Sequence, residues 1–294
     1  MSVWDELVGQ EEAIEVFRAA AQSELAEATT HESAMTHSWL VTGPPGSGRS
    51  NLAYAFASAL LCREGGCGQC SDCKQVAAKT HPDLATLTTE RVIISIDEVR
   101  ELVQSSQYSP AVSRYRVIVI EDADRMAERT SNVLLKALEE PPERTVWILC
   151  APSEADLIPT IRSRVRSVRL RVPSVESVSA LLQQRDDEDA ATAERAARHA
   201  QSHIGMAHRL ATNSEAAERR DETVQLALNI RGVRDAVMAA ARMLEIATAD
   251  AKAITEERDA VELVQLRRSM GVAEEDAVPA NLRSQVKNLE DKQK

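Results

Sequence analysis

The chain has 294 residues, enough for about two domains and a sizeable core. Its 46 acidic residues outnumber 35 basic ones, so the net charge of −11 excludes a general nucleic-acid-binding coat and leaves only local contacts with DNA. Aromatic residues make up 3%, which argues against stacking platforms for single-stranded bases.

The sequence carries no membrane or export signal. None of its apolar runs approaches the roughly 20 residues that span a bilayer. The N-terminal segment is acidic and lacks the apolar core of a signal peptide. We therefore expect a cytoplasmic protein.

The first half of the chain alternates between expected helices and strands. Apolar residues at helical spacing predict a helix within 3–28, and an uncharged helix is expected from Asn51 to Leu61. Asp97 is the expected N-cap of a helix over 97–105, and Pro141-Pro142 ends another over 127–140. Apolar or β-branched runs predict strands at 38–42, within 84–94, at 116–120 and at 145–150. This alternation predicts a three-layer α/β domain around a parallel sheet.

Beyond residue 172 only helical patterns remain. Short Ala-rich helices are expected over 174–213, and a longer amphipathic helix over 221–247, with Val233, Val237, Ala240 and Leu244 on one face. Residues 273–294 are polar and are expected to form a solvated helix or a disordered tail.

A glycine-rich loop follows the first expected strand. Residues 43–50 match the phosphate-loop pattern G-x-x-x-x-G-K-[ST] except for arginine in place of lysine. Gly43, Gly46 and Gly48 would let backbone N–H groups face a phosphate, and Ser50 would hold Mg²⁺. Arg49 is planar and bulkier than the lysine that reaches the β- and γ-phosphates, so we expect little or no ATP hydrolysis.

An acidic pair follows the strand expected at 116–120. Glu121 and Asp122 stand where a Walker B pair belongs, at the carboxyl end of a buried strand, but in reversed order. Glu121 is long enough to hold Mg²⁺, whereas Asp122 is about one methylene too short to polarise the attacking water. We interpret the pair as a degenerate Walker B motif; a solvated acidic turn is the alternative.

Four of the five cysteines lie within twelve residues. Cys62, Cys67, Cys70 and Cys73 have the spacing of a tetrahedral zinc site, with Gly65, Gly66 and Gly68 supplying tight turns. Four protein ligands leave no open position for catalysis, so the expected role is structural. Cys150, at a strand end, is expected to be a buried apolar side chain.

A basic segment interrupts this otherwise acidic chain. Five arginines occupy ten positions, at 162, 164, 166, 169 and 171. Either they form a solvated basic strand edge with intramolecular ion pairs, or one arginine is presented to a phosphate on another subunit.

Together these motifs carry a family resemblance that is strong over about residues 4–213. The chain resembles the delta-prime subunits of bacterial DNA polymerase III clamp loaders, within the AAA+ superfamily. The sequences of its motifs are similar to those of the actinobacterial branch. The motifs occur in the family's order: LVGQ (7–10), THSWLVTGPPGSGRS (36–50), the four cysteines, THPDL (80–84), RVIVIEDADRM (116–126), NVLLKALEEPP (132–142) and IRSRVR (161–166).

The resemblance implies a hetero-pentamer with gamma/tau and delta subunits, which loads the sliding clamp on primed DNA. It implies an AAA+ domain over 1–172 with a zinc module at 62–73, a helical lid over 173–213, and a partial helical collar over 214–294. In this family the delta-prime subunit is usually a rigid, non-hydrolysing member that presents an arginine finger to a neighbour's ATP. That arginine corresponds to Arg164, although Val165 replaces the family's cysteine.

Three departures from the active gamma/tau pattern indicate a degenerate nucleotide site. The phosphate-loop lysine is Arg49, the sensor-one threonine pair corresponds to Ala151-Pro152, and the sensor-two arginine corresponds to Gly205. We therefore expect ATP or ADP with Mg²⁺ to bind weakly or not at all, and nothing in the sequence resembles a polymerase site.

Two other functions compete with this interpretation. An active AAA+ ATPase of the gamma/tau type is the main alternative, and Arg49 is the residue that argues against it. A zinc-based nucleic-acid module is disfavoured because residues 62–73 contain only one basic residue, Arg63.

Overall fold

The computed structural model describes residues 2–5, 7–25, 35–89 and 91–269. The chain divides into two compact units, Met1–His208 and Arg209–Lys294. The expected boundaries near residues 172 and 213 stay predictions. The expected polar tail at 273–294 lies outside the described residues.

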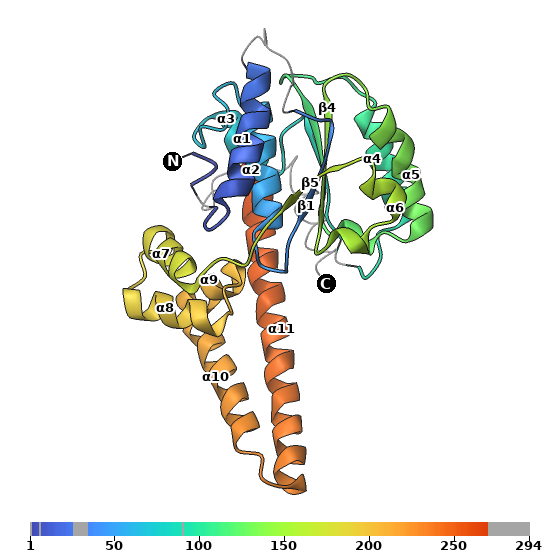
Figure 1. Cartoon of the computed structure of the whole chain (residues 1–294). Coiled ribbons are helices and arrows are strands. Elements are labelled where there is room, and N and C mark those ends of the chain that lie inside the picture. Colours follow the sequence, from blue (N-terminus) through green and yellow to red (C-terminus); the bar gives the residue numbers. More distant parts are fainter. Residues whose placement is uncertain (1, 6, 26–34, 90, 270–294) are drawn as a thin grey trace, which may run out of the picture. The chain divides into compact units, whose positions relative to one another are not determined.

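The first unit contains a five-stranded parallel sheet of order β2-β3-β4-β1-β5 (Figure 1). All expected strands are present, although β2 is shorter than the segment 84–94. Because the strands are parallel, their carboxyl ends meet at one edge of the sheet. The strands are β1 (Ser38–Thr42), β2 (Leu84–Leu87), β3 (Arg116–Ile120), β4 (Thr145–Ala151) and β5 (Arg166–Arg169).

Helices cover both faces of this sheet, as expected for a three-layer α/β domain. Side chains alternate along each strand, so Trp39 enters the core beneath α1 (Glu11–Leu25) and α2 (Arg49–Leu61), whereas Leu40 enters the opposite core. The opposite core is closed by α4 (Ile96–Ser106), α5 (Glu128–Glu139) and α6 (Pro159–Arg162). Figure 1 draws these helices to the right of the sheet.

Three aromatic rings fill the core beneath α1 and α2. Phe17 lies 4.3 Å from Phe56 and 4.9 Å from Trp39, measured between ring centroids. All three side chains are fully buried. Tilted aromatic contacts of this kind add to the stabilisation from burial, so this cluster fixes α2, and with it the phosphate loop, against the sheet.

The helix expected within 3–28 is present as α1, which begins at Glu11, and residues 3–5 form a turn. One detail of the expected helices is wrong. The N-cap of α4 is Ser95 rather than Asp97, because Ser95 accepts from the backbone N–H of Glu98 while the Glu98 carboxylate accepts from Ser95. This reciprocal capping box satisfies two N–H groups, and Asp97 lies in the first turn.

Short helices follow the sheet, and the boundary between the two units falls within the last of them. The segment after the sheet forms α7 (Val175–Asp186), α8 (Ala190–His199) and α9 (Ile204–Thr212), confirming the expected short helices. Between α2 and β2 lies α3 (Ser71–Ala77), and two single 3-10 turns, η1 (Ala123–Arg125) and η2 (Glu154–Asp156), follow β3 and β4.

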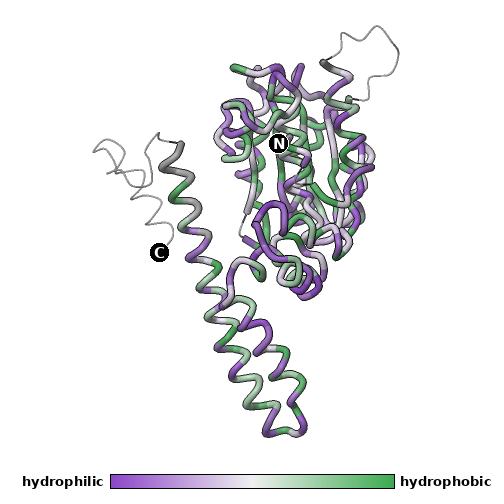
Figure 2. Tube along the Cα trace, turned by 90° about the vertical axis from the view of Figure 1, so that its left-hand side faces the viewer, coloured by the Kyte–Doolittle hydropathy of each residue, from purple (hydrophilic) through white to green (hydrophobic). Residues whose placement is uncertain are grey.

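The second unit is a helical hairpin. The helix expected over 221–247 is wrong, because α10 (Ser214–Leu228) ends before Gly232 and α11 (Val233–Ser269) begins after it. Hydrophilic and hydrophobic residues alternate along both helices (Figure 2). Arg219 of α10 and Arg209, at the end of α9, converge on Asp250 of α11, with N···O distances of 3.1 and 2.8 Å. The pair of Arg219 with Asp250 links the two helices of the hairpin. Among the described helices, none has the length and apolarity needed to cross a membrane.

Candidate functional site

The phosphate loop lies between β1 and α2, at the carboxyl edge of the sheet. Gly46 and Gly48 have φ of +80° and +89°, a conformation that glycine adopts without strain. The backbone N–H of Gly43 donates to the carbonyl of Pro152, 3.2 Å away, which ties the loop to the end of β4. Pro152, part of the pair predicted to correspond to sensor one, thus holds the loop through its backbone carbonyl, and neither Ala151 nor Pro152 carries a hydroxyl group.

Arg49 folds back onto its own loop. Its Nη1 donates to the carbonyl oxygen of Gly43 over 3.1 Å, and its Nη2 lies 3.9 Å from Oδ1 of Asp122. The side chain is 14% exposed. The guanidinium is therefore bound within the loop.

Glu121 is the most heavily hydrogen-bonded carboxylate of this edge. Burial alone would raise its pKa, but hydrogen bonds from Lys79, Ser50 and Tyr54 outweigh burial and lower the pKa to about 2. Burial of the Tyr54 hydroxyl, together with the negative charge of Glu121, raises the pKa of Tyr54. Four side chains donate to the carboxylate: Ser50 Oγ at 2.6 Å, Tyr54 OH at 2.7 Å, Lys79 Nζ at 2.7 Å and Thr88 Oγ1 at 2.9 Å.

Asp122, the second carboxylate of the pair, faces two arginines. It has φ of +51°, and its Oδ2 lies 3.4 Å from Nη2 of Arg125 while its Oδ1 faces Arg49. Both carboxylates of the reversed pair are therefore engaged by groups of this chain. The interpretation of the pair as a degenerate Walker B motif stays a prediction.

Helix α9 covers the phosphate loop. The backbone N–H of Ile204 lies 3.3 Å from the carbonyl oxygen of Gly46, and a Cβ placed on Gly46 would be only 2.2 Å from the ring of His203. Gly205, which is predicted to correspond to the sensor-two arginine, lies in the first turn of α9. Next to it is a pocket of about 260 Å³, lined by Gly46, Gly48, Arg49, Ser50, Asn51, Arg185, His203, Ile204, Gly205 and His208.

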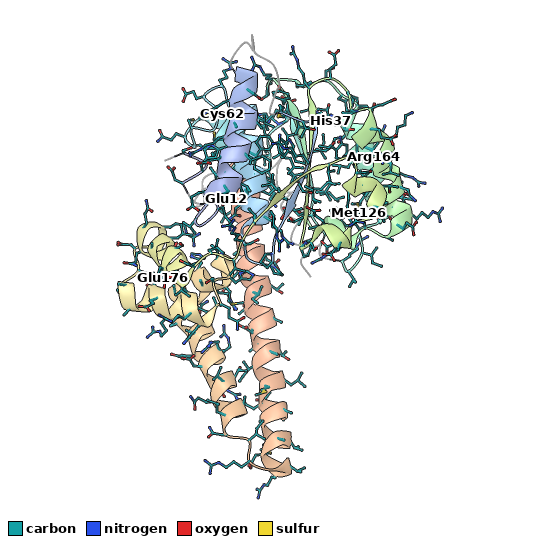
Figure 3. All side chains as sticks on the ribbon, viewed as in Figure 1. Glu12, His37, Cys62, Met126, Arg164 and Glu176 are labelled. Atoms are coloured by element: carbon teal, nitrogen blue, oxygen red, sulfur yellow. The ribbon has the colours of Figure 1, made fainter. Side chains whose placement is uncertain are left out.

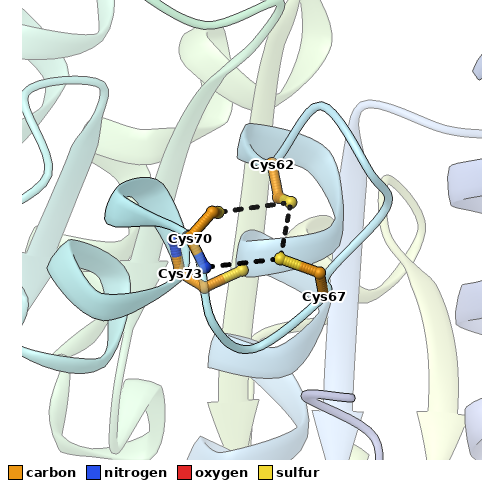
Figure 4. A group of neighbouring side chains, drawn as sticks. All are labelled: Cys62, Cys67, Cys70 and Cys73. Carbon is orange, nitrogen blue, oxygen red and sulfur yellow. Dashed lines mark hydrogen bonds between the residues drawn. The ribbon is translucent and has the colours of Figure 1, made fainter. Parts of the chain in front are cut away.

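The four clustered cysteines converge after α2, around the start of α3 (Figure 4). Their Sγ atoms all lie within 4.8 Å of one another, and Cys62 Sγ is 3.8 Å from Cys67 Sγ and 3.6 Å from Cys70 Sγ. A tetrahedral zinc with bonds of about 2.3 Å requires sulfur–sulfur separations of about 3.8 Å. The cluster therefore fits zinc.

Backbone N–H groups surround these sulfur atoms, as a site for thiolates requires. Glu64 N donates to Cys62 Sγ over 3.3 Å, and Gly68 N donates to Cys73 Sγ over 3.3 Å. Burial opposes ionisation of Cys62, yet the backbone hydrogen bonds outweigh it and lower its pKa to about 7. At Cys73 burial outweighs the hydrogen bond from Gly68 and raises the pKa. The backbone contacts orient the sulfur atoms. Cys150 is buried in β4, as expected.

Arg164 lies on the other side of the sheet from Cys62, beyond α6 (Figure 3). Its Nε donates to Oε1 of Glu139 over 2.6 Å, and its Nη2 contacts the same carboxylate. Its Nη1 donates to the carbonyl of Thr160 over 2.7 Å and to Ser163 Oγ over 3.0 Å. The guanidinium is therefore oriented by its own chain while remaining 32% exposed.

The other arginines of the segment differ from Arg164. Arg166 lies on edge strand β5 with its guanidinium carbon 5.1 Å from the Trp39 ring centroid, and Arg171 pairs with Glu12. Arg162 and Arg169 are exposed. The intramolecular ion pairs of Arg164 with Glu139 and of Arg171 with Glu12 fit the basic-edge interpretation, and the presentation of an arginine to another subunit stays a prediction.

Four residues of the site were not predicted from the sequence: Tyr54, Lys79, Thr88 and His203. A signal existed for Thr88, because β2 pairs in parallel with β3 and the residue after Leu87 must lie near the residue after Ile120. Lys79 and His203 reach the loop only through the tertiary packing of α3 and α9.

The sequence is similar to a known protein family and to proteins with established names. The model of the family described as "DNA polymerase III, delta subunit" matches residues 18–174, more than half of the chain. The chain belongs to this family. A relative named DNA polymerase III subunit delta' in Pseudomonas aeruginosa is 39% identical over 134 residues, which cover 44% of this chain and 41% of the relative. Subunit delta' of Escherichia coli is 34% identical, covering 47% and 43%.

The relatives include a second type of subunit. The protein named DNA polymerase III subunit gamma/tau of Mycobacterium tuberculosis is 31% identical over 153 residues, which cover 50% of this chain and 26% of that protein. This chain thus matches about two-fifths of the delta' relatives' length and about a quarter of that gamma/tau protein. The delta-prime resemblance is confirmed, while the actinobacterial branch stays a prediction.

The fold is that of an AAA+ protein. A mutant form of RuvB from Thermotoga maritima superposes with a TM-score of 0.51 at 17% identity, covering 81% of this chain and 71% of that one. At this identity the likeness shows the fold alone, and it confirms the predicted AAA+ α/β class.

Proposed function

We propose that this chain is a delta-prime-type subunit of a clamp loader that does not hydrolyse ATP itself and presents Arg164 to the ATP of a neighbouring subunit. The partners in this proposal are gamma/tau and delta subunits in a hetero-pentamer. The assembly places a sliding clamp on primed DNA in the cytoplasm. Family membership supports the class of protein, and the local geometry supports the division of labour.

The hydrogen bonds of Glu121 are the observation that carries the proposal. An ATPase needs this carboxylate and the Ser50 hydroxyl for the metal, and a cation from the loop for the β- and γ-phosphates. Here Glu121 accepts from four side chains, and Arg49 donates to the carbonyl of Gly43. The residues do not fit a Mg²⁺–ATP complex, so no catalytic step is assigned to this chain's own loop.

Arg164 is suited to act on another subunit. A guanidinium can bind a γ-phosphate through two parallel N–H groups and neutralise the charge that develops during phosphoryl transfer. The carboxylate of Glu139 holds it at the surface, where a more strongly charged phosphate can replace that partner. Because the nucleotide site of this chain is degenerate in this proposal, Arg164 has no γ-phosphate to bind in the same chain.

The cysteine cluster has a structural part in this proposal. Zinc bound by Cys62, Cys67, Cys70 and Cys73 would have four protein ligands and no position for substrate. It would connect the end of α2 with the start of α3, and so hold together a segment that has little apolar core of its own.

Reconstitution tests the proposal. Purified chain is mixed with gamma/tau and delta subunits from the same source, and complex formation, DNA-dependent ATP hydrolysis and clamp loading are measured with and without it. We expect it to enter the complex with fixed stoichiometry and to be required for loading. Failure to enter would refute the assignment.

A second part of this experiment distinguishes the proposed non-hydrolysing subunit from the main alternative, an active gamma/tau-type ATPase. Substituting Ser50→Ala in this chain alone should leave the ATPase rate of the complex unchanged if the chain does not hydrolyse ATP. A large loss in that variant would favour the alternative.

A further inference from the structure

The ligands expected for a magnesium ion are already bound to each other. Mg²⁺ requires oxygen ligands with free lone pairs at about 2.1 Å. Ser50 donates its hydroxyl proton to Oε2 of Glu121 and keeps its own lone pairs, but Oε1 of the same carboxylate already accepts from three further groups. Among these donors only Lys79 brings a positive charge, and its Nζ lies 2.7 Å from Oε1.

Steric exclusion does not explain this arrangement. Ser50, Tyr54, Lys79 and Glu121 all line a cavity of about 510 Å³. The cavity has room for an ion and its water. What opposes an ion is the ammonium group already at the carboxylate.

The backbone of Lys79 indicates that this position depends on its side chain. Lys79 has φ of +56°, in the left-handed region that is unfavourable for residues other than glycine. It follows the end of α3, where its N–H donates to the carbonyl of Val76 and the N–H of Thr80 donates to that of Gln75. Glycine is the usual residue at such a helix end, so a lysine here is strained and points to a role for its ammonium.

The cysteine module and a neighbouring ring fix the ammonium in place. Helix α3 begins among the metal-ligating cysteines, with Cys70 as its N-cap, and ends just before Lys79. The ring centroid of Tyr54 lies 4.8 Å from Nζ, close enough for a cation–π contact. Because it is part of the chain, the ammonium is present at high effective concentration and never diffuses away.

We propose that Lys79 is a resident cation that takes the place of the divalent metal ion at Glu121, positioned there by the cysteine module. The Walker B carboxylate is then neutralised whether or not nucleotide is present. Any nucleotide bound by this chain is bound without a divalent ion. This inference rests on the proposed function and deepens it by giving a cause for the absence of hydrolysis.

Binding of Mn²⁺, used as a paramagnetic probe for Mg²⁺, tests the inference. Electron paramagnetic resonance measures Mn²⁺ bound by the full chain in the presence of ADP, for the wild type, Lys79→Met, and Lys79→Met with Glu121→Gln. Lys74→Met is the matched control, because Lys74 is an exposed lysine of helix α3, which ends just before Lys79. Lys79→Gly, which relieves the left-handed strain, gives a second variant that folds even if methionine is not tolerated.

We expect the wild type and Lys74→Met to hold no Mn²⁺ above background. Lys79→Met or Lys79→Gly should bind Mn²⁺ at least about tenfold more tightly, and Glu121→Gln should abolish that gain. Mn²⁺ bound tightly by the wild type, or no gain in either variant, would overturn the inference. Neither result bears on whether the chain enters the clamp-loader complex, so the two proposals fail separately.

Discussion

Arg164 donates from its Nε to Oε1 of Glu139 over 2.6 Å, which joins the Ser-Arg segment to the end of helix α5. Exposed ion pairs stabilise proteins by about 0–1 kcal/mol, and both side chains are partly exposed. Glu139→Ala should therefore change the free energy of unfolding by less than about 1 kcal/mol. Urea denaturation measures this change, with Glu140→Ala as the neighbouring control.

If the ion pair contributes so little free energy, a phosphate on another molecule can displace Glu139 and bind Arg164. A loss well above about 2 kcal/mol in Glu139→Ala, more than an exposed pair contributes, would instead mean that Arg164 is fixed to its own chain as a structural residue. The trans role would then lose its support.

The cysteine cluster should bind one equivalent of zinc. Metal analysis of anaerobically purified protein should return about one zinc per chain, and Cys70→Ser should lower that content and the unfolding temperature together. Cys150→Ser is the control for zinc content alone, since Cys150 lies in β4 outside the cluster and its buried position makes a serine there destabilising without any loss of zinc. Less than half an equivalent in the wild type would contradict the assignment.

The acid stability of the protein should depend on Glu121. Its folded pKa of about 2 lies below the unfolded value of about 4.3, so the ionised carboxylate stabilises the fold above about pH 4.3. That stabilisation is lost as the pH falls from about 4.3 towards 2. Glu121→Gln has no carboxylate to protonate, so its free energy of unfolding should fall less steeply over this range. Parallel curves in urea would show that the hydrogen bonds to Glu121 contribute nothing.

The isolated chain should not turn over ATP. By the resemblance to gamma/tau subunits, Arg49, Ala151-Pro152 and Gly205 stand where groups that contact the γ-phosphate are expected, and Glu121 accepts from Lys79. We expect no steady-state phosphate release above background. A rate near ~1 s⁻¹, the low end of ordinary enzyme turnover, that disappears in Ser50→Ala would contradict this expectation.

The sequence predicts the layers of this fold well because each strand is a short apolar run and each helix carries its own periodicity. Because strands alternate with helices along the chain, the sequence also predicts that the strands run parallel and that Gly43 and Glu121 lie at the same edge of the sheet. Errors arose where local signals compete. Asp97 and Ser95 can both cap a helix, and only the reciprocal bond with Glu98 decides between them.

Contacts that depend on tertiary packing could not be predicted. Lys79 lies 42 residues before Glu121 in the chain, and its ammonium reaches the carboxylate only because α3 ends in a left-handed turn. Likewise, His203 meets Gly46 through the packing of α9 on the loop. The hairpin of α10 and α11 turns at Gly232, a break that helical periodicity alone does not reveal.

Arg164→Ala in a reconstituted loader tests the central claim most directly. Clamp- and DNA-stimulated ATPase should fall by about 10- to 1000-fold at the one site that this arginine serves, while zinc content and complex assembly stay unchanged. Arg162→Ala is the matched control, since Arg162 is exposed and two residues away, and Arg166→Ala, despite losing its contact with Trp39, should also have much less effect. Equal losses in all three variants, or clamp loading at the wild-type rate by Arg164→Ala, would contradict the account.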